Sequence, residues 1–196
     1  MTATDSFTAR RRAALVRLAA IAALPLTLLG VCHGRSWAHV FHSRESALEL
    51  AFSRADEVRP ITLFLSEFEL AHCSRLAGSH CSERTIRAYA GYDAEDALIG
   101  YAFIDTHPVR SLQETVMFVS SPAGRIQKSV VLAFHEPADY MATPRWLTQF
   151  KGHSLSSQLA LHRGIDVMSG ATITSNVLTS AARRVLAVQR IKLGQP

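Results

Sequence analysis

The centre of the chain contains four β-prone segments, and these constrain its fold more than any other feature. They are residues 85–92, 97–104, 114–120 and 126–134, which are rich in aromatic and β-branched side chains. Between the last two segments, residues 121–125 read Ser-Pro-Ala-Gly-Arg. Pro early and Gly late are typical of a tight turn, so we expect these two segments to form a hairpin.

Helical patterns flank this β region. Residues 43–58 place apolar side chains on one side of a predicted helix. A short β-prone run, residues 61–65, follows. Ser66 and Glu69 then have the spacing of a capping box, which predicts a helix to about residue 76 that stops at Gly78.

The clearest helix is predicted at the end of the chain, over residues 175–193. Its apolar stripe consists of Val177, Leu178, Ala181, Val185, Leu186 and Val188, with Arg183, Arg184, Arg190 and Lys192 on or beside the solvent-facing side. Consecutive strands with helices at both ends predict an α+β fold, an antiparallel sheet with flanking helices.

The first 38 residues read as an export leader. Arg10, Arg11 and Arg12 precede an apolar stretch, residues 18–31, and the polar segment after it ends in Ser36-Trp37-Ala38. Small residues at these positions predict cleavage after Ala38. The apolar stretch is shorter than the roughly 20 residues that span a bilayer, although an uncleaved anchor to the inner membrane remains the alternative. We therefore expect a periplasmic or otherwise extracytoplasmic protein.

The basic charge of the chain belongs mostly to this leader. The full chain has a net charge of +5, but five of its 21 Lys and Arg residues lie within the first 38 positions, against one acidic residue. The remainder holds 16 basic and 15 acidic residues. No patch there interleaves aromatic with basic side chains, so nucleic-acid binding is not expected.

Cys73 and Cys81 form an even pair in a chain expected to reach an oxidising compartment, which predicts a disulfide. The alternative is metal handling, because the dipeptides His72-Cys73 and His80-Cys81 offer four ligands that zinc or copper accepts. Their spacing matches no metal motif.

The segment from Asp166 to Ser175, with the sequence Asp-Val-Met-Ser-Gly-Ala-Thr-Ile-Thr-Ser, leads directly into the last predicted helix. A helix start presents unpaired N–H groups and a partial positive charge, which favour phosphate. Gly170 and Ala171 leave room for a bulky group to approach the Thr172 hydroxyl. The alternative is that Ser169, Thr172, Thr174 or Ser175 simply caps the helix.

The pattern Asp166-x-x-Ser169-Gly170-Ala171-Thr172 resembles the flavinylation motif of the FMN-binding domain family. That family includes flavin-carrying components of the sodium-pumping NADH:quinone reductase and of the Rnf electron-transport complex. The resemblance implies that a flavin transferase moves FMN from FAD onto Thr172, which leaves a phosphoester bond. Ser169, Gly170 and Ala171 would form the loop that the transferase reads, with Asp166 as its upstream acidic member. Thr174 and Ser175 complete the family's common form of the motif.

A second region is similar to the same family. His135-Glu136-Pro137 follows a predicted strand, and Trp146-x-x-Gln149-Phe150-x-Gly152 follows shortly after. The resemblance implies an FMN-binding domain over residues 89–196 and an extension of helix and strand over residues 39–88. It also implies a stand-alone exported member of the family rather than a component of either complex.

Each of these supporting residues has a plainer interpretation. Trp146 and Tyr140 stack on the flavin ring or belong to the core. His135 and Glu136 contact the flavin, or Glu136 forms a surface pair with an arginine. His107 and Arg110 steer an anionic partner, or lie in a solvated loop.

The resemblance implies an electron carrier that works between membrane or periplasmic redox proteins and has a flavin transferase as a further partner. No Gly-x-Gly-x-x-Gly follows a predicted strand, and no nucleophile–base pair stands out. Two rivals remain open: an exported docking module without redox activity, and the metal-handling protein. A flavin reductase with its own substrate ranks below electron carriage.

Overall fold

The computed structural model describes residues 39–194. The predicted leader, residues 1–38, with its cleavage point after Ala38, lies outside the described residues. Between residues 39 and 194, no helix has both the length and the apolar character needed to cross a membrane.

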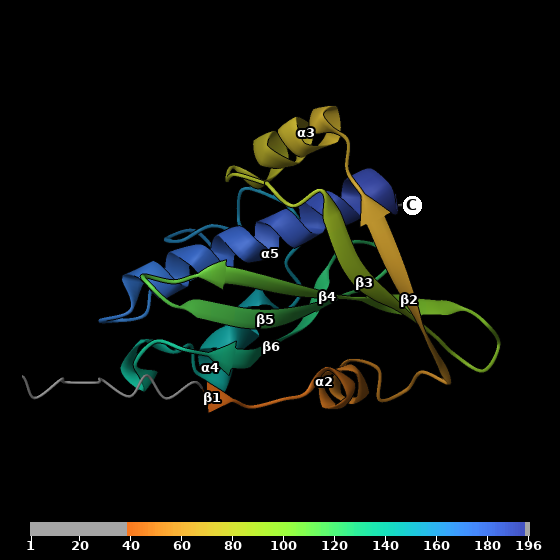
Figure 1. Ribbon diagram of the computed structural model, residues 1–196, viewed down its shortest axis with the longest axis horizontal. Helices are drawn as coiled ribbons and strands as arrows, with labels where there is room; N and C mark the ends of the chain where they lie inside the picture. Colours follow the sequence, from red (N-terminus) through yellow and green to blue (C-terminus); the bar gives the residue numbers. More distant parts are fainter. Residues whose placement is uncertain (1–38, 195–196) are drawn as a thin grey trace, which may run out of the picture. The chain divides into compact units, whose positions relative to one another are not determined.

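A six-stranded antiparallel sheet forms the centre of the described part (Figure 1). Its strands are β1 (His39–Val40), β2 (Glu57–Phe64), β3 (Thr85–Tyr92), β4 (Leu98–Pro108), β5 (Gln113–Ser120) and β6 (Ile126–Phe134), and their order is β1-β6-β5-β4-β3-β2. The predicted strands 85–92 and 126–134 are confirmed residue for residue, and the α+β class is confirmed with them. Strand β2 pairs with β3 along its full length, so residues 57–64 belong to the same sheet as the rest.

Side chains alternate between two cores on the two faces of this sheet. Phe103 and Phe118 belong to the larger core, which lies beneath α3 (Glu67–Ala77) and α5 (Thr172–Lys192). Their chain neighbours Ala102 and Met117 belong to the smaller core beneath α2 (Arg44–Ala51). Figure 1 shows α3 and α5 on one side of the sheet and α2 on the other. Because helices cover both faces, the central strands are apolar on both sides.

Helix α2 is shorter than the helix predicted over residues 43–58, because it ends at Ala51. Phe52 then packs onto the sheet, where its ring occupies the space that a Cβ on Gly91 would need. The chain turns and begins β2 at Glu57. Pairing with β3 therefore overrides the helical pattern in the second half of the predicted segment.

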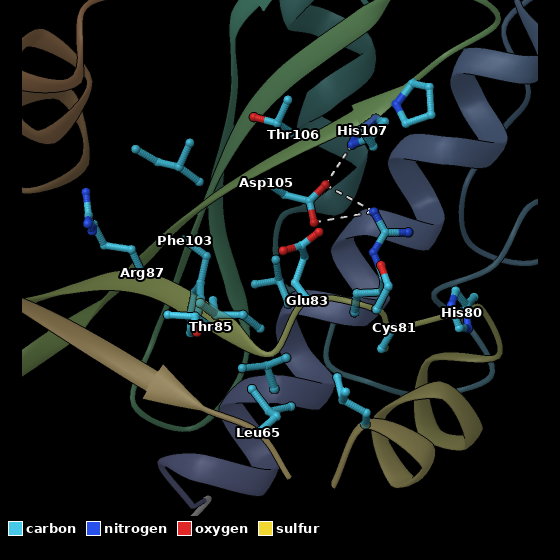
Figure 2. A pocket seen from close by; sticks show the side chains of 18 residues that line it. Leu65, His80, Cys81, Glu83, Thr85, Arg87, Phe103, Asp105, Thr106 and His107 are labelled. Carbon is cyan, nitrogen blue, oxygen red and sulfur yellow. Dashed lines mark hydrogen bonds and ion pairs between the residues drawn. The ribbon is translucent and has the colours of Figure 1, made fainter. Parts of the chain in front are cut away.

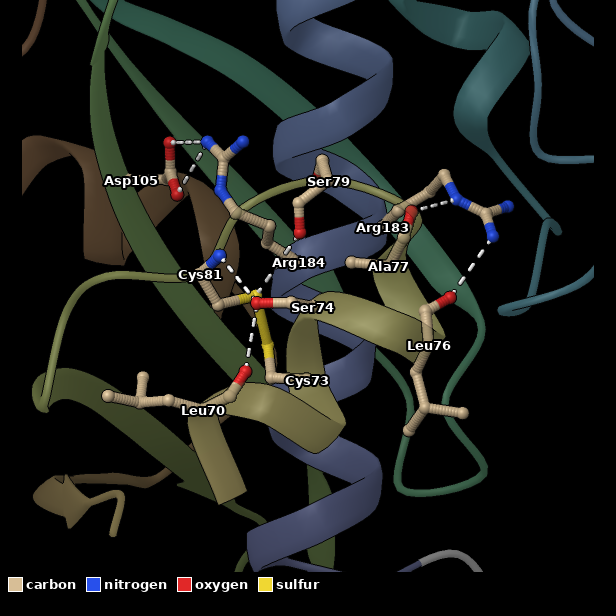
Figure 3. Close-up of a disulfide and its surroundings, with 10 residues drawn as sticks. All are labelled: Leu70, Cys73, Ser74, Leu76, Ala77, Ser79, Cys81, Asp105, Arg183 and Arg184. Atoms are coloured by element: carbon tan, nitrogen blue, oxygen red, sulfur yellow. Dashed lines mark hydrogen bonds and ion pairs between the residues drawn. A yellow bond between two sulfur atoms is a disulfide. The ribbon is translucent and has the colours of Figure 1, made fainter. Parts of the chain in front are cut away.

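Helix α3 begins with the predicted capping box. Ser66 Oγ accepts the N–H of Glu69 at 3.3 Å, and the Glu69 carboxylate accepts the N–H of Ser66 at 2.8 Å. Gly78 ends the helix in the left-handed region, with φ of 67°. The disulfide between Cys73 and Cys81 then ties the end of α3 to the segment that enters β3 (Figure 3).

Helix α5 begins at Thr172, three residues earlier than predicted. The prediction that Arg183 and Arg184 lie on or beside its solvent-facing side is wrong, because both are half-buried. Arg183 donates to carbonyl oxygens in the last turn of α3, and Arg184 binds Asp105 at 3.0 Å (Figure 3). Helix α3 and strand β4 pack against this side of α5, and the spacing of apolar residues within α5 does not indicate that packing.

Three short helical turns connect β6 to the last segment: η1 (Ala138–Tyr140), α4 (Pro144–Leu147) and η2 (Thr148–Phe150). Phe150 is fully buried, and its ring lies edge-on to Phe118 with centroids 5.8 Å apart. This contact anchors the α4–η2 segment to the larger core, close to the loop that precedes α5.

Candidate functional site

The loop before α5 turns sharply and leaves its tip open. Ala171 N–H donates to the carbonyl oxygen of Met168 at 3.1 Å, which closes the turn. Gly170 has φ of 77°, and a Cβ built on it would meet no atom within 4 Å. Glycine is therefore favoured there by backbone conformation and not by crowding. The space beside the backbone is open for a large group.

Helix α5 starts without a side-chain cap. Its N-cap residue is Ala171, and no side chain bonds to the first-turn N–H groups. The interpretation that Ser169, Thr172, Thr174 or Ser175 caps this helix is therefore wrong. Thr172 is the first helical residue, and it is exposed. Exposed N–H groups at a helix start, without a carboxylate nearby in the first turn, suit an incoming anion.

Ser175 instead holds the loop in place. Its side chain is fully buried; Oγ accepts the N–H of Met168 at 2.9 Å and donates to the carbonyl oxygen of Ala171 at 3.1 Å. Thr174 is also buried, on the same turn. These two motif positions face inward, while Asp166, Ser169 and Gly170 are exposed. The motif thus divides into an accessible tip and a buried base.

Trp146 and Gln149 fix the entrance to this loop. The indole Nε1–H of Trp146 donates to the carbonyl oxygen of Asp166 at 2.9 Å, and Gln149 Oε1 accepts the Asp166 N–H at 2.8 Å. The half-buried Trp146 ring also packs edge-on to Phe150, with centroids 5.4 Å apart. This contact with the core and the hydrogen bond make Trp146 a positioning residue for the loop. Gln149 has the same function, which the sequence pattern did not reveal.

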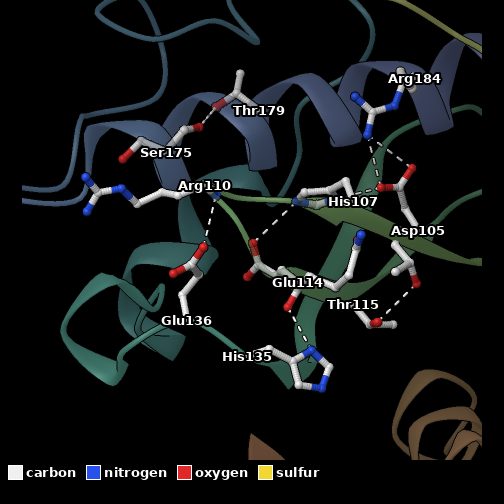
Figure 4. A network of polar contacts seen from close by, with 12 residues as sticks. Asp105, His107, Arg110, Glu114, Thr115, His135, Glu136, Ser175, Thr179 and Arg184 are labelled. Carbon is white, nitrogen blue, oxygen red and sulfur yellow. Dashed lines mark hydrogen bonds and ion pairs between the residues drawn. The ribbon is translucent and has the colours of Figure 1, made fainter. Parts of the chain in front are cut away.

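Glu136 anchors a different loop, the turn between β4 and β5. Its buried Oε1 accepts the N–H groups of Arg110, Ser111 and Leu112 at 3.2, 2.7 and 2.8 Å (Figure 4). The N–H groups of Ser111 and Leu112 hold the pKa of Glu136 below its ordinary value. The alternative of a surface pair between Glu136 and an arginine side chain is wrong, because its partners are three backbone N–H groups and the Ser111 hydroxyl. His135 lies beside it, with Nδ1 3.0 Å from the carbonyl oxygen of Gln113.

The prediction of a solvated loop for His107 is wrong, because this residue is buried within β4. Its Nδ1 lies 2.7 Å from the Asp105 carboxylate, and its Nε2 lies 3.4 Å from Glu114, the residue opposite it on β5. Both carboxylate oxygens of the fully buried Glu114 lack a hydrogen-bond partner among the described residues. Asp105 and His107 are two residues apart in a β-prone segment, and this spacing could have predicted that they share one face of a strand. The pairing of His107 with Glu114 could not be predicted in this way, because it depends on the register between β4 and β5.

Burial and charge act in opposite directions in this cluster. Burial opposes protonation of His107, but its contacts with Asp105 and Glu114 outweigh burial and raise its pKa. Burial also opposes ionisation of Asp105, yet the bonds from His107 and Arg184 lower its pKa. Burial raises the pKa of Glu114. The cluster therefore carries both an ionised carboxylate and a carboxyl group that resists ionisation.

A pocket of about 590 Å³ opens beside this cluster (Figure 2). Asp105 and His107 line it from β4, Arg184 and Val185 from α5, and Cys81 from the segment before β3. Arg184 lies twelve residues after Thr172, which corresponds to about 18 Å along a helix. The pocket is thus separate from the loop that contains Thr172.

The sulfur atoms of the two histidine–cysteine dipeptides are both used in the disulfide between Cys73 and Cys81. A disulfide sulfur is no thiolate ligand, so the four-ligand set of the metal-handling alternative is not formed. Within residues 39–194, no group of three or more His, Cys, Asp or Glu side chains is arranged to hold a metal ion.

Comparison with known proteins gives one family match. Residues 111–187 match the family described as FMN-binding domain. The crystal structure of Shewanella oneidensis NqrC aligns with 74% of this chain and 83% of its own, with a TM-score of 0.48 and 16% sequence identity. No curated protein matches the chain.

The matched region runs from the β4–β5 turn through the Thr172 loop to the last third of α5, so it contains the turn that Glu136 anchors and the uncapped helix start. Both features therefore lie in the part of the chain that matches an FMN-binding domain. The family match over residues 111–187 confirms the resemblance found in the sequence. The match supports a flavin-binding role. The match begins at residue 111, later than the expected start at residue 89.

Proposed function

We propose that this chain is an exported electron carrier whose FMN is joined to Thr172 through a phosphoester bond. One observation carries the proposal: Thr172 presents an exposed hydroxyl at the uncapped start of α5, inside the region that matches the FMN-binding family. The same threonine is the acceptor position of the sequence motif.

The surroundings of Thr172 fit a flavin phosphate. The first N–H groups of α5 have no intrahelical partner, and the helix start carries a partial positive charge that attracts phosphate. The absence of a side chain at Gly170 leaves open space beside the hydroxyl. The first turn contains no acidic residue that would repel an anion.

Thr172 supplies the nucleophilic oxygen for the attachment. Its Oγ1 forms the bond to the flavin-side phosphorus of FAD, the bond between the two phosphates of FAD breaks, and AMP leaves. The hydroxyl proton passes to the transferase or to solvent. The exposed residues Asp166, Ser169 and Gly170 form the surface that a flavin transferase reads, while the buried Ser175 keeps the turn in shape.

The remaining residues orient the site. Trp146 and Gln149 hold the backbone of Asp166 from both sides, so the loop enters α5 in one geometry. When bound, FMN takes up and releases one or two electrons, while the protein supplies the tether, orientation and electrostatics. A covalent tether suits an exported protein, because a dissociated flavin would be lost.

The proposed partners are a flavin transferase and redox proteins of the membrane or periplasm. Residues 1–38 are the proposed export leader, either cleaved after Ala38 or kept as an anchor. The disulfide between Cys73 and Cys81 is of the kind that persists in an oxidising compartment.

The attachment is tested by co-expressing the full chain with a flavin transferase. We expect in-gel flavin fluorescence and a mass gain of one FMN for the wild type. Thr172→Ser keeps a hydroxyl and is the matched control, so it is expected to be labelled, while Thr172→Ala is not.

Label retained by Thr172→Ala would mean that another residue is the acceptor. A wild-type chain that stays colourless beside an active transferase would instead support the docking module. After labelling, reduction of the bound flavin and its reoxidation by a one-electron acceptor, followed by absorbance, tests the carrier function. A label that cannot be reduced would refute that function.

A further inference from the structure

We propose that Arg110 binds the phosphate group that joins FMN to Thr172. The inference rests on the proposed attachment at Thr172 and adds a specific side chain from the β4–β5 turn to the binding site. This side chain supplies a cation on the sheet side of the phosphate, opposite the N–H groups of α5.

The turn that contains Arg110 is rigidly held. One carboxylate oxygen of Glu136 accepts three successive backbone N–H groups, from residues 110 to 112. Val109 is buried in the larger core, and its N–H donates to the carbonyl oxygen of Leu112 at 3.0 Å. The backbone of Arg110 is thus fixed from both directions, although the residue itself is exposed. A fixed backbone lowers the entropy lost when the side chain binds a ligand.

The guanidinium group of Arg110 lies over the ring of Tyr140, with its central carbon 5.0 Å from the ring centroid. No carboxylate of the described residues forms an ion pair with it; Arg184, by contrast, is paired with Asp105. The stacking contact restrains the side chain and leaves the guanidinium N–H groups available in the ring plane. An oriented cation without an acidic partner suits an anionic ligand.

Two tertiary contacts place Arg110 level with Thr172. Ser120, which pairs with Tyr101 near the start of β4, bonds to Gln189, whereas Asp105 bonds to Arg184. Strand β4 therefore runs in the opposite direction to α5.

From Asp105 to Arg110 the extended chain advances about 16 Å, and from Arg184 back to Thr172 the helix recedes about 18 Å. Figures 1 and 4 show the β4–β5 turn beside the start of α5.

Thr172 is accessible at the start of α5. Residues three and seven positions apart share one face of a helix, so Thr172 lies on the same stripe as Ser175 and Thr179. Both of those residues are buried, Ser175 beside the segment that contains Met168, whereas Thr172 is exposed at the end of the stripe.

A guanidinium group matches the proposed ligand chemically. A phosphodiester has two oxygens that carry one negative charge, and the parallel N–H groups of arginine bind such a pair in a bidentate fashion. The N–H groups of the helix start approach the same phosphate from the α5 side. Lysine would supply the charge without the fork geometry, so Arg110→Lys is expected to restore only part of the effect.

The test compares Arg110→Gln, Arg110→Lys and the wild type in the full chain. Arg190→Gln is the matched control, because it removes the same charge from an exposed position at the other end of α5. Two quantities are measured: the initial rate of FMN transfer, and the rise in Tm of the labelled protein over the unlabelled protein.

Loss of a charge-assisted hydrogen bond predicts a transfer rate lower by about tenfold for Arg110→Gln. The rise in Tm on labelling should also be smaller in that variant, while Arg190→Gln behaves as the wild type. The Tm comparison separates contact with the bound phosphate from contact with the transferase. A labelled Arg110→Gln with the wild-type rate and the wild-type Tm rise overturns this inference alone. No labelling of the wild type overturns the proposed function together with it.

Discussion

Ser175→Ala tests whether the buried base of the acceptor loop holds its tip in place. The substitution removes the acceptor for the Met168 N–H and the donor to the Ala171 carbonyl oxygen, at 2.9 and 3.1 Å. Each such bond contributes about 0.5–1.5 kcal/mol net. Alanine is the better helix former by roughly half a kcal/mol, which offsets part of the loss. We therefore expect the free energy of unfolding to fall by about 1–2 kcal/mol.

Ser180→Ala is the control, because Ser180 lies on the same helix, is half-buried and has no side-chain hydrogen bond among the described residues. Urea unfolding of both variants measures the difference, and a loss of about 3–6 °C in Tm is expected for Ser175→Ala. The rate of FMN transfer should fall in that variant only, because the turn before Thr172 loosens. Equal stability and equal labelling of the two variants would refute the proposed role of the buried hydroxyl.

Two further substitutions test the site and the buried cluster. Gly170→Ala is expected to lower the free energy of unfolding by about 1 kcal/mol in urea titrations, because φ is 77° and open space excludes a clash as the cause; a more stable variant would contradict this. For Glu114→Gln, the gain in stability over the wild type is expected to grow as the pH rises above about 4.3, the ordinary pKa of a glutamate. Burial raises the pKa of Glu114 in the folded wild type. The stability that the protonated Glu114 contributes is therefore fully present below the pKa of the unfolded chain. It is lost as the pH rises through the pKa of the folded protein. The raised His107 pKa acts in the same direction, and a difference that stays constant with pH would contradict the reasoning.

Short-range sequence patterns predicted the helix start and the strands that depend only on residues close together in the chain. The capping box at Ser66 and the strands at residues 85–92 and 126–134 depend on neighbouring side chains and backbone preference, so they could be predicted from the sequence. The end of α2 could not be predicted in this way. It depends on the packing of Phe52 against Gly91 and on the pairing of β2 with β3.

The same division applies to the charged residues. Arg183 and Arg184 have the spacing of solvent-facing residues, but their partners on α3 and β4 lie 79 to 107 residues away in the chain, far outside any local window. Glu136 and His107 are buried by contacts with the β4–β5 turn and with Glu114. A polar side chain is buried only where the fold supplies a hydrogen-bonding or charged partner. These partners depend on the register between strands, which a single sequence does not specify.

At the candidate site, the sequence by itself determined the small-residue loop, the threonine that follows it and the resemblance to the FMN-binding family. Only the tertiary structure decided that α5 starts uncapped at Thr172, that Trp146 and Gln149 hold the Asp166 backbone, and that Arg110 comes level with the acceptor. The physical reason is that a motif records which groups are present. Their direction and burial depend on the elements that pack around them.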